Sequence, residues 1–224
     1  MIRSLEAGEW GPGDAIPSEG DLAARFNVSQ GTVRKAIDEM AAENLLVRRQ
    51  GRGTFVASHD DPRSFYRFLR LVPDDGSAAQ TVSVPLSCTT KAADPEVAAA
   101  LGLNVGEPVI YVERLLCFNG EAVVYDQIHL VSDLFSGLTL ASLSGGERSL
   151  YSVFENDYGV RMIRAEEHLR AVAADPASAK LLSVQAGAPL LLVERTAYTY
   201  GEKPVEWRRG LYCTNRHYYR NDLG

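Results

Sequence analysis

The chain has 224 residues, 46% of them hydrophobic, and a formal net charge of −6 at pH 7. This length allows two domains, one small and one near the commonest domain size, and the composition is that of a soluble globular protein. The three cysteines lack C-x-x-C spacing, so neither a disulfide framework nor a zinc site is predicted. No signal peptide or apolar run of transmembrane length is visible, so we expect a cytoplasmic protein with no membrane partner.

The first predicted elements are two short helices separated by a tight turn. Ser18 is expected to cap the first helix, with Asp21 in the capping-box position, and Ser29 is expected to cap the second. Asn27 suits the left-handed conformation that ends a helix. The predicted buried faces are Leu22, Ala23 and Phe26 in the first helix and Val33, Ala36, Ile37, Met40 and Ala41 in the second. Two short helices joined in this way are typical of a helix-turn-helix.

The outer side of the second helix is polar and basic at its N-terminal end. In a helix-turn-helix this end enters the major groove of DNA. The residues expected to meet base edges or phosphates there are Ser29, Gln30, Thr32, Arg34 and Lys35.

A basic hairpin is predicted after the second helix, with strands at residues 45–49 and 54–57 joined by a glycine-containing turn. A small tip can approach DNA closely, and guanidinium groups suit phosphates or a narrow minor groove. The hairpin is therefore interpreted as a DNA-binding wing, with contacts expected from Arg49, Gln50, Gly51, Arg52 and Gly53. The alternative is an ordinary hairpin with a solvated basic edge.

Positive charge is concentrated in this region although the whole chain is acidic. Residues 25–56 contain six basic residues against three acidic ones, a local charge of +3. The acidic remainder should weaken nonspecific association with DNA, which favours a regulator over a protein that coats DNA.

The rest of the chain contains an internal duplication at an offset of 81 residues. Each half is predicted to have an Asp N-cap, Pro at the first helical position, an alanine-rich helix, a Gly-x-Pro turn and a strand. The matching segments begin at Asp94-Pro95 and Asp175-Pro176 and continue through Glu113-Arg114 and Glu194-Arg195. Two copies with so long a period indicate two equivalent halves of one domain rather than a solenoid.

The predicted strands of this domain lie at residues 109–115 and 122–130 in one half and 190–196 and 204–212 in the other. A helix at 150–159 and a strand at 162–172 are predicted between them. Antiparallel strands with helices packed on one face predict an α+β domain.

Residues 17–56 resemble the DNA-binding domain of the GntR family of bacterial transcription regulators. The resemblance rests on WGPGD at residues 10–14, IPSE at 16–19 and the wing sequence GRGTFV at 51–56. Only residues 1–9 precede Trp10, where the family has a longer first helix, so we expect part of that helix to be missing. Family members usually carry arginine at the positions of Gly20 and Gln30, so an altered operator is expected, and Gln30 could instead pair with adenine.

The region that follows resembles the UTRA domain of the HutC subfamily of GntR regulators. The resemblance rests on the repeated Asp-Pro and Gly-x-Pro segments, on SLY at residues 149–151 and on PVE at 204–206. It implies a winged helix-turn-helix at residues 1–58, a linker at 59–64 and a UTRA domain of chorismate lyase-like fold at 65–224. The resemblance also implies that the domain binds a small metabolite, dimerises and changes the spacing of the two DNA-binding heads.

The same resemblance implies an effector site. Its expected residues are Arg114, which would hold an anionic group, with Asp126, Ser149, Glu206 and Tyr212. Phosphosugar-binding relatives tend to have a second arginine at the position of Leu116, so a carboxylate or amino-acid-like effector is favoured. Alternatively, Arg114 and its repeat partner Arg195 form structural ion pairs. His129 and His168 show no metal-ligand spacing, so neither a metal nor a cofactor is expected.

The sequence therefore predicts a ligand-responsive, homodimeric repressor. Its partners would be a pseudo-palindromic double-stranded DNA operator, a small anionic effector and a second copy of the chain. The main alternative is a chorismate lyase-like enzyme domain fused to a DNA-binding head, against which no nucleophile motif is visible. A third possibility is an architectural DNA-binding protein without an effector, which the large second domain disfavours.

Overall fold

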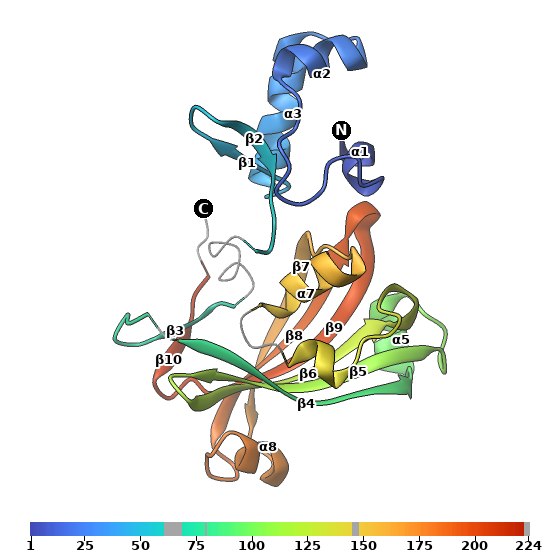
Figure 1. Cartoon of the computed structure of the whole chain (residues 1–224). Helices are drawn as coiled ribbons and strands as arrows, with labels where there is room; N and C mark the ends of the chain where they lie inside the picture. Colours follow the sequence, from blue (N-terminus) through green and yellow to red (C-terminus); the bar gives the residue numbers. More distant parts are fainter. Residues whose placement is uncertain (61–68, 79, 145–147, 222–224) are drawn as a thin grey trace. The chain divides into compact units, whose positions relative to one another are not determined.

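The computed structural model describes residues 1–60, 69–78, 80–144 and 148–221. The chain divides into two compact units, Met1–Ser64 and Phe65–Gly224, each described here by itself (Figure 1). Most of the predicted linker, residues 61–64, lies outside the described residues.

The described residues of the first unit, called the head below, form three helices and a hairpin. They are α1 (Ile2–Glu6), α2 (Glu19–Phe26), α3 (Gln30–Ala42), β1 (Leu46–Arg49) and β2 (Gly53–Val56). The Ser18 hydroxyl accepts a hydrogen bond from the Asp21 backbone N–H, and Ser29 does the same for Thr32, so both predicted N-caps are present. Asn27 ends α2 with φ 52° and ψ 49°, as its position predicted.

The head is held together by apolar side chains at the predicted helical spacing. Leu22 of α2 and Val33, Ile37 and Met40 of α3 are buried, together with residues of the hairpin. Phe26 was predicted to share this face, but it is 37% exposed. It is the last residue of α2, and the Arg25 guanidinium lies 5.2 Å from its ring centroid, so a cation covers the ring on one side.

The second unit is built on a six-stranded antiparallel sheet in the order β4-β5-β6-β9-β8-β7. Its strands are β4 (Thr81–Ala92), β5 (Pro108–Phe118), β6 (Glu121–Val131), β7 (Arg164–Ala173), β8 (Pro189–Thr199) and β9 (Lys203–Tyr212). Its helices are α5 (Pro95–Leu101), α6 (Leu140–Leu143), α7 (Leu150–Tyr158) and α8 (Pro176–Leu181), with short 3-10 helices at Ser132–Leu134 and Tyr200–Glu202.

The predicted duplication is visible in this order. The series β4, α5, β5, β6 is repeated as β7, α8, β8, β9, and the two halves join where β6 pairs with β9. Asp94 caps α5 and Asp175 caps α8, each followed by proline at the start of the helix. The duplicated sequence therefore produces two similar half-sheets joined into one.

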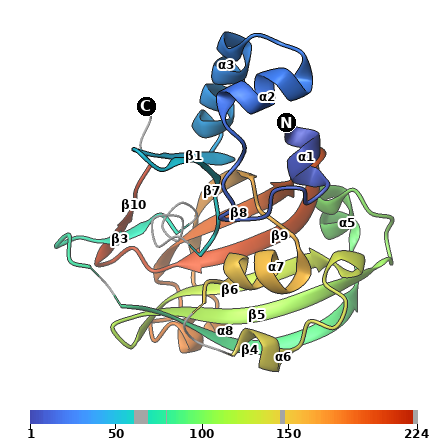
Figure 2. The ribbon, with the colours of Figure 1, turned by 45° about the horizontal axis from the view of Figure 1, so that its top comes forward.

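Helices cover both faces of the sheet, whereas the sequence predicted helices on one face. Neighbouring residues of a strand point to opposite faces. Ile110 of β5 packs with Leu150 and Phe154 of α7, while the adjacent Val109 packs with Val97 of α5. The duplicated helices α5 and α8 share the second face because α8 packs on Tyr125 and Leu190. Figure 2 shows α7 lying across β5 and β6 on the first face, called the α7 face below.

Two further strands form a small separate sheet. β3 (Leu71–Pro73) pairs antiparallel with β10 (His217–Tyr219), which joins the start of this unit to its C-terminal part. Leu69 and Leu71 pack in one apolar cluster with Leu116 and Tyr212 of the large sheet. The sequence did not predict β3, β10 or β4.

Candidate DNA-binding surface and effector site

The N-terminal end of α3 is exposed, as a surface that meets DNA must be. Gln30, Thr32, Arg34 and Lys35 are all exposed in the head. The Thr32 hydroxyl lies 2.9 Å from that of the N-cap Ser29. The structure thus keeps the predicted contact residues together on one helix end.

Arg34 is held by an acidic residue of the neighbouring helix. Its Nε and Nη2 donate hydrogen bonds of 3.0 and 2.8 Å to Glu19 Oε2. The hydrogen bond from Arg34 lowers the pKa of Glu19, and the same bond raises the pKa of Arg34. Because both side chains reach the surface, this pair is worth little in stability and chiefly fixes the direction of the guanidinium.

The base of the wing is fixed by an ion pair to α3, whereas its tip is exposed to solvent. Arg48 forms an ion pair with Asp38 of α3, which anchors the hairpin to the helix. The Arg49 guanidinium lies over the Phe55 ring, 4.7 Å from its centroid. Neither Arg49 nor Arg52 has an ion-pair partner among the described residues, so the two cations at the tip are not neutralised within the head. Gly51, with a φ of 69°, lies in the turn between them, and Gly53, with a φ of 107°, begins β2.

Four buried charged side chains meet on the α7 face of the second unit, and we call them the charged cluster: Arg114, Asp126, Glu206 and Arg208. Arg114 Nη2 and Arg208 Nη1 lie 2.9 and 3.1 Å from the same oxygen, Asp126 Oδ2. Arg208 Nη2 lies 2.9 Å from Glu206 Oε2. Tyr151 of α7 donates a 2.8 Å hydrogen bond to Glu206 Oε1. The cluster therefore unites three of the five predicted effector residues.

Sequence reasoning missed Arg208 and Tyr151. Arg208 could have been found from the two-residue period of a strand, because Glu206, Arg208, Gly210 and Tyr212 alternate along β9. Tyr151 was part of the quoted SLY segment, but nothing local indicated that its hydroxyl reaches another strand.

The charges in the cluster act on one another. Burial and the nearby Arg208 lower the pKa of Arg114, more strongly than Asp126 raises it. Burial also lowers the pKa of Arg208, but Glu206 and Asp126 raise it above its usual value. An added anion beside Arg114 would offset the repulsion between the two guanidinium groups.

A small hollow opens beside Arg114. Its polar lining comes from the Ser83 hydroxyl, Arg114 and Arg148, and its apolar lining from residues that include Leu150 and Val153 of α7. Arg114 Nη1 lies 3.5 Å from the Ser83 oxygen. Arg148 donates hydrogen bonds of 2.8 and 2.9 Å to Asp157, so Arg114 and the Ser83 hydroxyl are the groups that best suit an added anion here.

Two predicted effector residues stand apart from this hollow. The Ser149 hydroxyl accepts a 3.0 Å hydrogen bond from the Ser152 backbone N–H and so caps α7. Tyr212 is 2% exposed and packs among apolar residues near β3, with its ring centroid 6.2 Å from that of Tyr219. In this structure the first residue positions the helix beside the hollow, and the second belongs to the packing around the start of the unit.

Arg195 occupies the equivalent place to Arg114 in the second half, and it forms an ion pair with a residue of the neighbouring strand. It donates a 2.7 Å hydrogen bond to Glu167 of β7, which also accepts a hydrogen bond from the Tyr219 hydroxyl. Glu194, the adjacent acid, instead pairs with Arg170 and Arg209 on the opposite face. The ion-pair interpretation thus describes Arg195 well, whereas Arg114 combines an ion pair with a place at the hollow.

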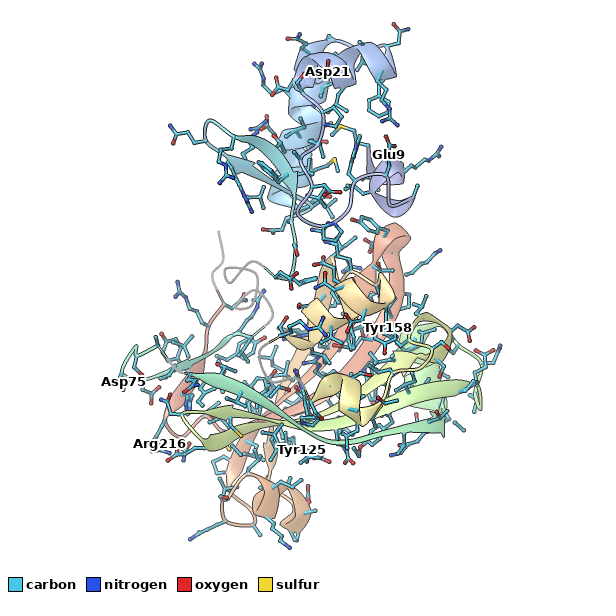
Figure 3. The ribbon with its side chains drawn as sticks, in the orientation of Figure 1. Glu9, Asp21, Asp75, Tyr125, Tyr158 and Arg216 are labelled. Carbon is cyan, nitrogen blue, oxygen red and sulfur yellow. The ribbon has the colours of Figure 1, made fainter. Side chains whose placement is uncertain are left out.

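No group of three or more His, Cys, Asp and Glu side chains able to hold a metal occurs in the described part of the chain. His129 lies between aromatic rings, with centroids 4.9 Å from Tyr111 and 5.3 Å from Trp207. Within the same ranges no helix is long and apolar enough to cross a membrane. Figure 3 labels Tyr158 on α7 and Tyr125 on the other side of the sheet.

Comparison with known proteins identifies both units. Residues 1–56 match the gntR family of bacterial regulatory proteins, and residues 79–218 match the UTRA domain. The chain belongs to the GntR family. Its UTRA domain places it with the HutC-like regulators, which confirms the resemblance, the fold class and the DNA-binding role predicted from the sequence.

Relatives cover nearly the whole chain. The transcriptional repressor PhnF of Mycolicibacterium smegmatis is 31% identical over 91% of this chain and 82% of its own length. The histidine utilization repressor of Pseudomonas putida is 26% identical over 97% of this chain and 86% of its own. The crystal structure of the ligand-binding domain of a GntR-family regulator from Bordetella bronchiseptica is 47% identical in sequence and superposes with a TM-score of 0.69. The match covers 71% of this chain and 99% of that domain. These proteins are transcriptional regulators, not enzymes.

Proposed function

We propose that this protein is a homodimeric repressor that leaves a pseudo-palindromic operator when a small anionic metabolite binds its UTRA domain. The names of its relatives as repressors support the regulatory part of this proposal. A dimer would present two α3 helices to half-sites about one helical turn apart. The site of action would be the operator DNA in the bacterial cytoplasm.

The operator contacts are proposed for the exposed end of α3 and for the wing tip. Gln30, Thr32 and Lys35 are exposed there, and Glu19 directs the Arg34 guanidinium. The unpaired cations at Arg49 and Arg52 suit phosphates beside the major groove. Base contacts from the helix would then set the sequence, and wing contacts would supply affinity that depends on salt.

The effector is proposed to be a carboxylate or amino-acid-like anion held at the hollow beside Arg114. The observation that carries this proposal is the Arg114 guanidinium, buried and repelled by Arg208, at an opening that also has the Ser83 hydroxyl and Arg148. Leu116 lies in an apolar cluster and Arg148 already pairs with Asp157, which favours a singly charged carboxylate over a phosphate.

A route from the effector site to the start of the domain is also proposed. The pair Asp126 and Gly210 lies two residues along the strands from the pair Val124 and Tyr212, on the same face of the sheet. Tyr212 packs with Leu71 of β3, and this strand follows the linker. If effector binding shifts this packing, the end of the linker nearest β3 changes position and the spacing of the heads changes. The effector site and the DNA-binding surface are thereby coupled.

A thermal-shift screen of the purified chain tests the effector assignment. Small carboxylates, amino-acid catabolites and sugar phosphates are compared, because a bound ligand raises Tm by mass action. A hit should disappear in Arg114→Ala and persist in Arg170→Ala, which removes an arginine from the opposite face. The ligand that raises Tm is then added to the complex of the chain with its operator DNA in a DNA-binding assay. Ligand that binds without weakening the DNA complex contradicts the repressor mechanism, and a hit retained by Arg114→Ala contradicts the assigned site.

A further inference from the structure

Gly20 is an unusual choice for its position. It is the second residue of α2, and its φ does not lie in the left-handed region that favours glycine. Glycine is the poorest helix former after proline, so a glycine that no turn requires calls for another reason. The neighbouring side chain of Gln30 supplies that reason.

The side chain of Gln30 occupies the space over Gly20. A Cβ atom built on Gly20 would lie 3.4 Å from Gln30 Nε2 and 3.7 Å from Ser18 Oγ. A methyl group at this distance makes an ordinary contact, but a larger side chain would need the volume that the Gln30 amide now fills. Gly20 therefore permits the amide to lie against α2 at the beginning of α3.

Gln30 also keeps its hydrogen-bonding capacity unused. Within the head, the Thr32 hydroxyl is shared with Ser29, and the Arg34 guanidinium donates twice to Glu19. No hydrogen bond to the Gln30 amide occurs among the described residues. It is exposed, so both its donor and its acceptor can turn to a partner outside the protein.

We propose that Gln30 reads an adenine in each operator half-site and that Gly20 is the second member of this specificity pair. A glutamine amide can accept from adenine N6 and donate to N7 at the same time, which discriminates adenine from the other bases in the major groove. The first residues of a recognition helix are the ones that reach base edges. This inference rests on the proposed binding of an operator by α3.

Selection from a library of randomised DNA duplexes, with the full chain and no effector, tests the pair. The wild-type chain should select adenine at one position of each half-site. Gln30→Ala should reduce this preference by about tenfold while preferences at the other positions remain. Gln30→Arg should move the preference at the same position from adenine to guanine, because arginine pairs with guanine O6 and N7.

Gly20 variants separate a specific effect from general damage to the head. Gly20→Ala fits the 3.4 Å contact, so it should keep the adenine preference and leave Tm unchanged or raised. Gly20→Leu should displace the amide and reproduce the Gln30→Ala preference. Melting curves of all variants establish that the head remains folded.

The outcomes distinguish this inference from the proposal beneath it. An operator whose base preferences do not change in Gln30→Ala overturns the inference alone. The same holds if Gln30→Ala weakens all sequences equally, because Gln30 would then contact a phosphate. A wild-type chain that selects no sequence contradicts operator binding itself, and the inference falls with it.

Discussion

Gly210 lies on β9 between the charged cluster and Tyr212, and it is a position where one added methyl group should be costly. A Cβ atom there would lie 2.5 Å from the Tyr212 ring and 2.8 Å from Asp126 Oδ1. Both neighbours are buried, at 2% and 0% exposure, so neither has open space to move into. We therefore expect Gly210→Ala to destabilise the UTRA domain strongly.

Two costs add up to the expected magnitude. Overpacking a filled site typically costs about 1–3 kcal/mol. Asp126 must also shift from the two arginines that it pairs with at 2.9 and 3.1 Å. Breaking a buried ion pair fully costs about 3–5 kcal/mol, and a partial shift costs a fraction of it. The loss in free energy of unfolding should therefore be at least about 2 kcal/mol.

Urea unfolding followed by tryptophan fluorescence can measure this loss in one domain. The chain has two tryptophans, Trp10 in the head and Trp207 in the UTRA domain. A Trp10→Phe background leaves Trp207 as the reporter. Arg209→Ala is the matched control, because Arg209 lies on the same strand and its partly exposed ion pair with Glu194 should be worth about 1 kcal/mol. If Gly210→Ala loses no more stability than this control, the packing argument is wrong.

Three further outcomes are expected. Burial raises the pKa of Asp126, but its two arginine partners lower it below the usual 3.8, so its contribution to stability should disappear as pH falls below that value. Urea titrations at several pH values should therefore show a smaller loss of unfolding free energy on the acid side for Asp126→Asn than for the wild-type chain. An unchanged dependence on pH would refute this. Arg52→Ala should reduce the slope of log K for DNA binding against log salt concentration by about 1 per wing, measured by fluorescence anisotropy. An unaltered slope would show that Arg52 does not contact a phosphate. Tyr219→Phe removes the hydrogen bond to Glu167. The effector should still raise Tm, but it should release DNA less completely. Full release would show that this hydrogen bond does not couple the effector site to DNA binding.

Local signals predicted the ends of helices well. Ser29 and Asp175 each cap the helix that their sequence context indicated. The helix predicted at residues 150–159 is observed as α7 at Leu150–Tyr158, with Gly159 as its left-handed C-cap. Such ends depend on hydrogen bonds between residues two or three positions apart, which a single sequence contains in full.

The strand β4 shows where local reasoning failed. It is a 12-residue strand at the edge of the sheet, with a register shift between Pro85 and Ser87. A proline inside a run normally argues against a strand, because it cannot donate to the ladder. At an edge, next to a bulge, that loss is tolerated. Whether a strand lies at an edge depends on pairing across the whole domain, which is why the sequence did not reveal it.

The charged cluster was only partly predictable for a related reason. Arg114, Asp126 and Glu206 were inferred from family positions, but Arg208 was not, and it pairs with Asp126 across 82 positions of the sequence. The register of β6 against β9 creates this contact, and it follows from the meeting of the two halves of the duplication. Each half contains one pair of its own, Arg114 with Asp126 and Arg208 with Glu206, and the contact between Arg208 and Asp126 joins the two pairs.

The duplication also explains why one sheet can contain both the proposed effector site and a structural ion pair. Arg114 and Arg195 stand at equivalent positions of the two halves, and both are buried on the α7 face. Arg195 is held by Glu167, which the hydroxyl of Tyr219 ties to the C-terminal strand paired with β3. Arg114 has only the shared Asp126 as its ion-pair partner in the described residues and faces the hollow. Because an arginine with a partial partner can accept an anion at lower cost than one already engaged, the asymmetry between these two equivalent residues favours Arg114 as the effector-binding side of the domain.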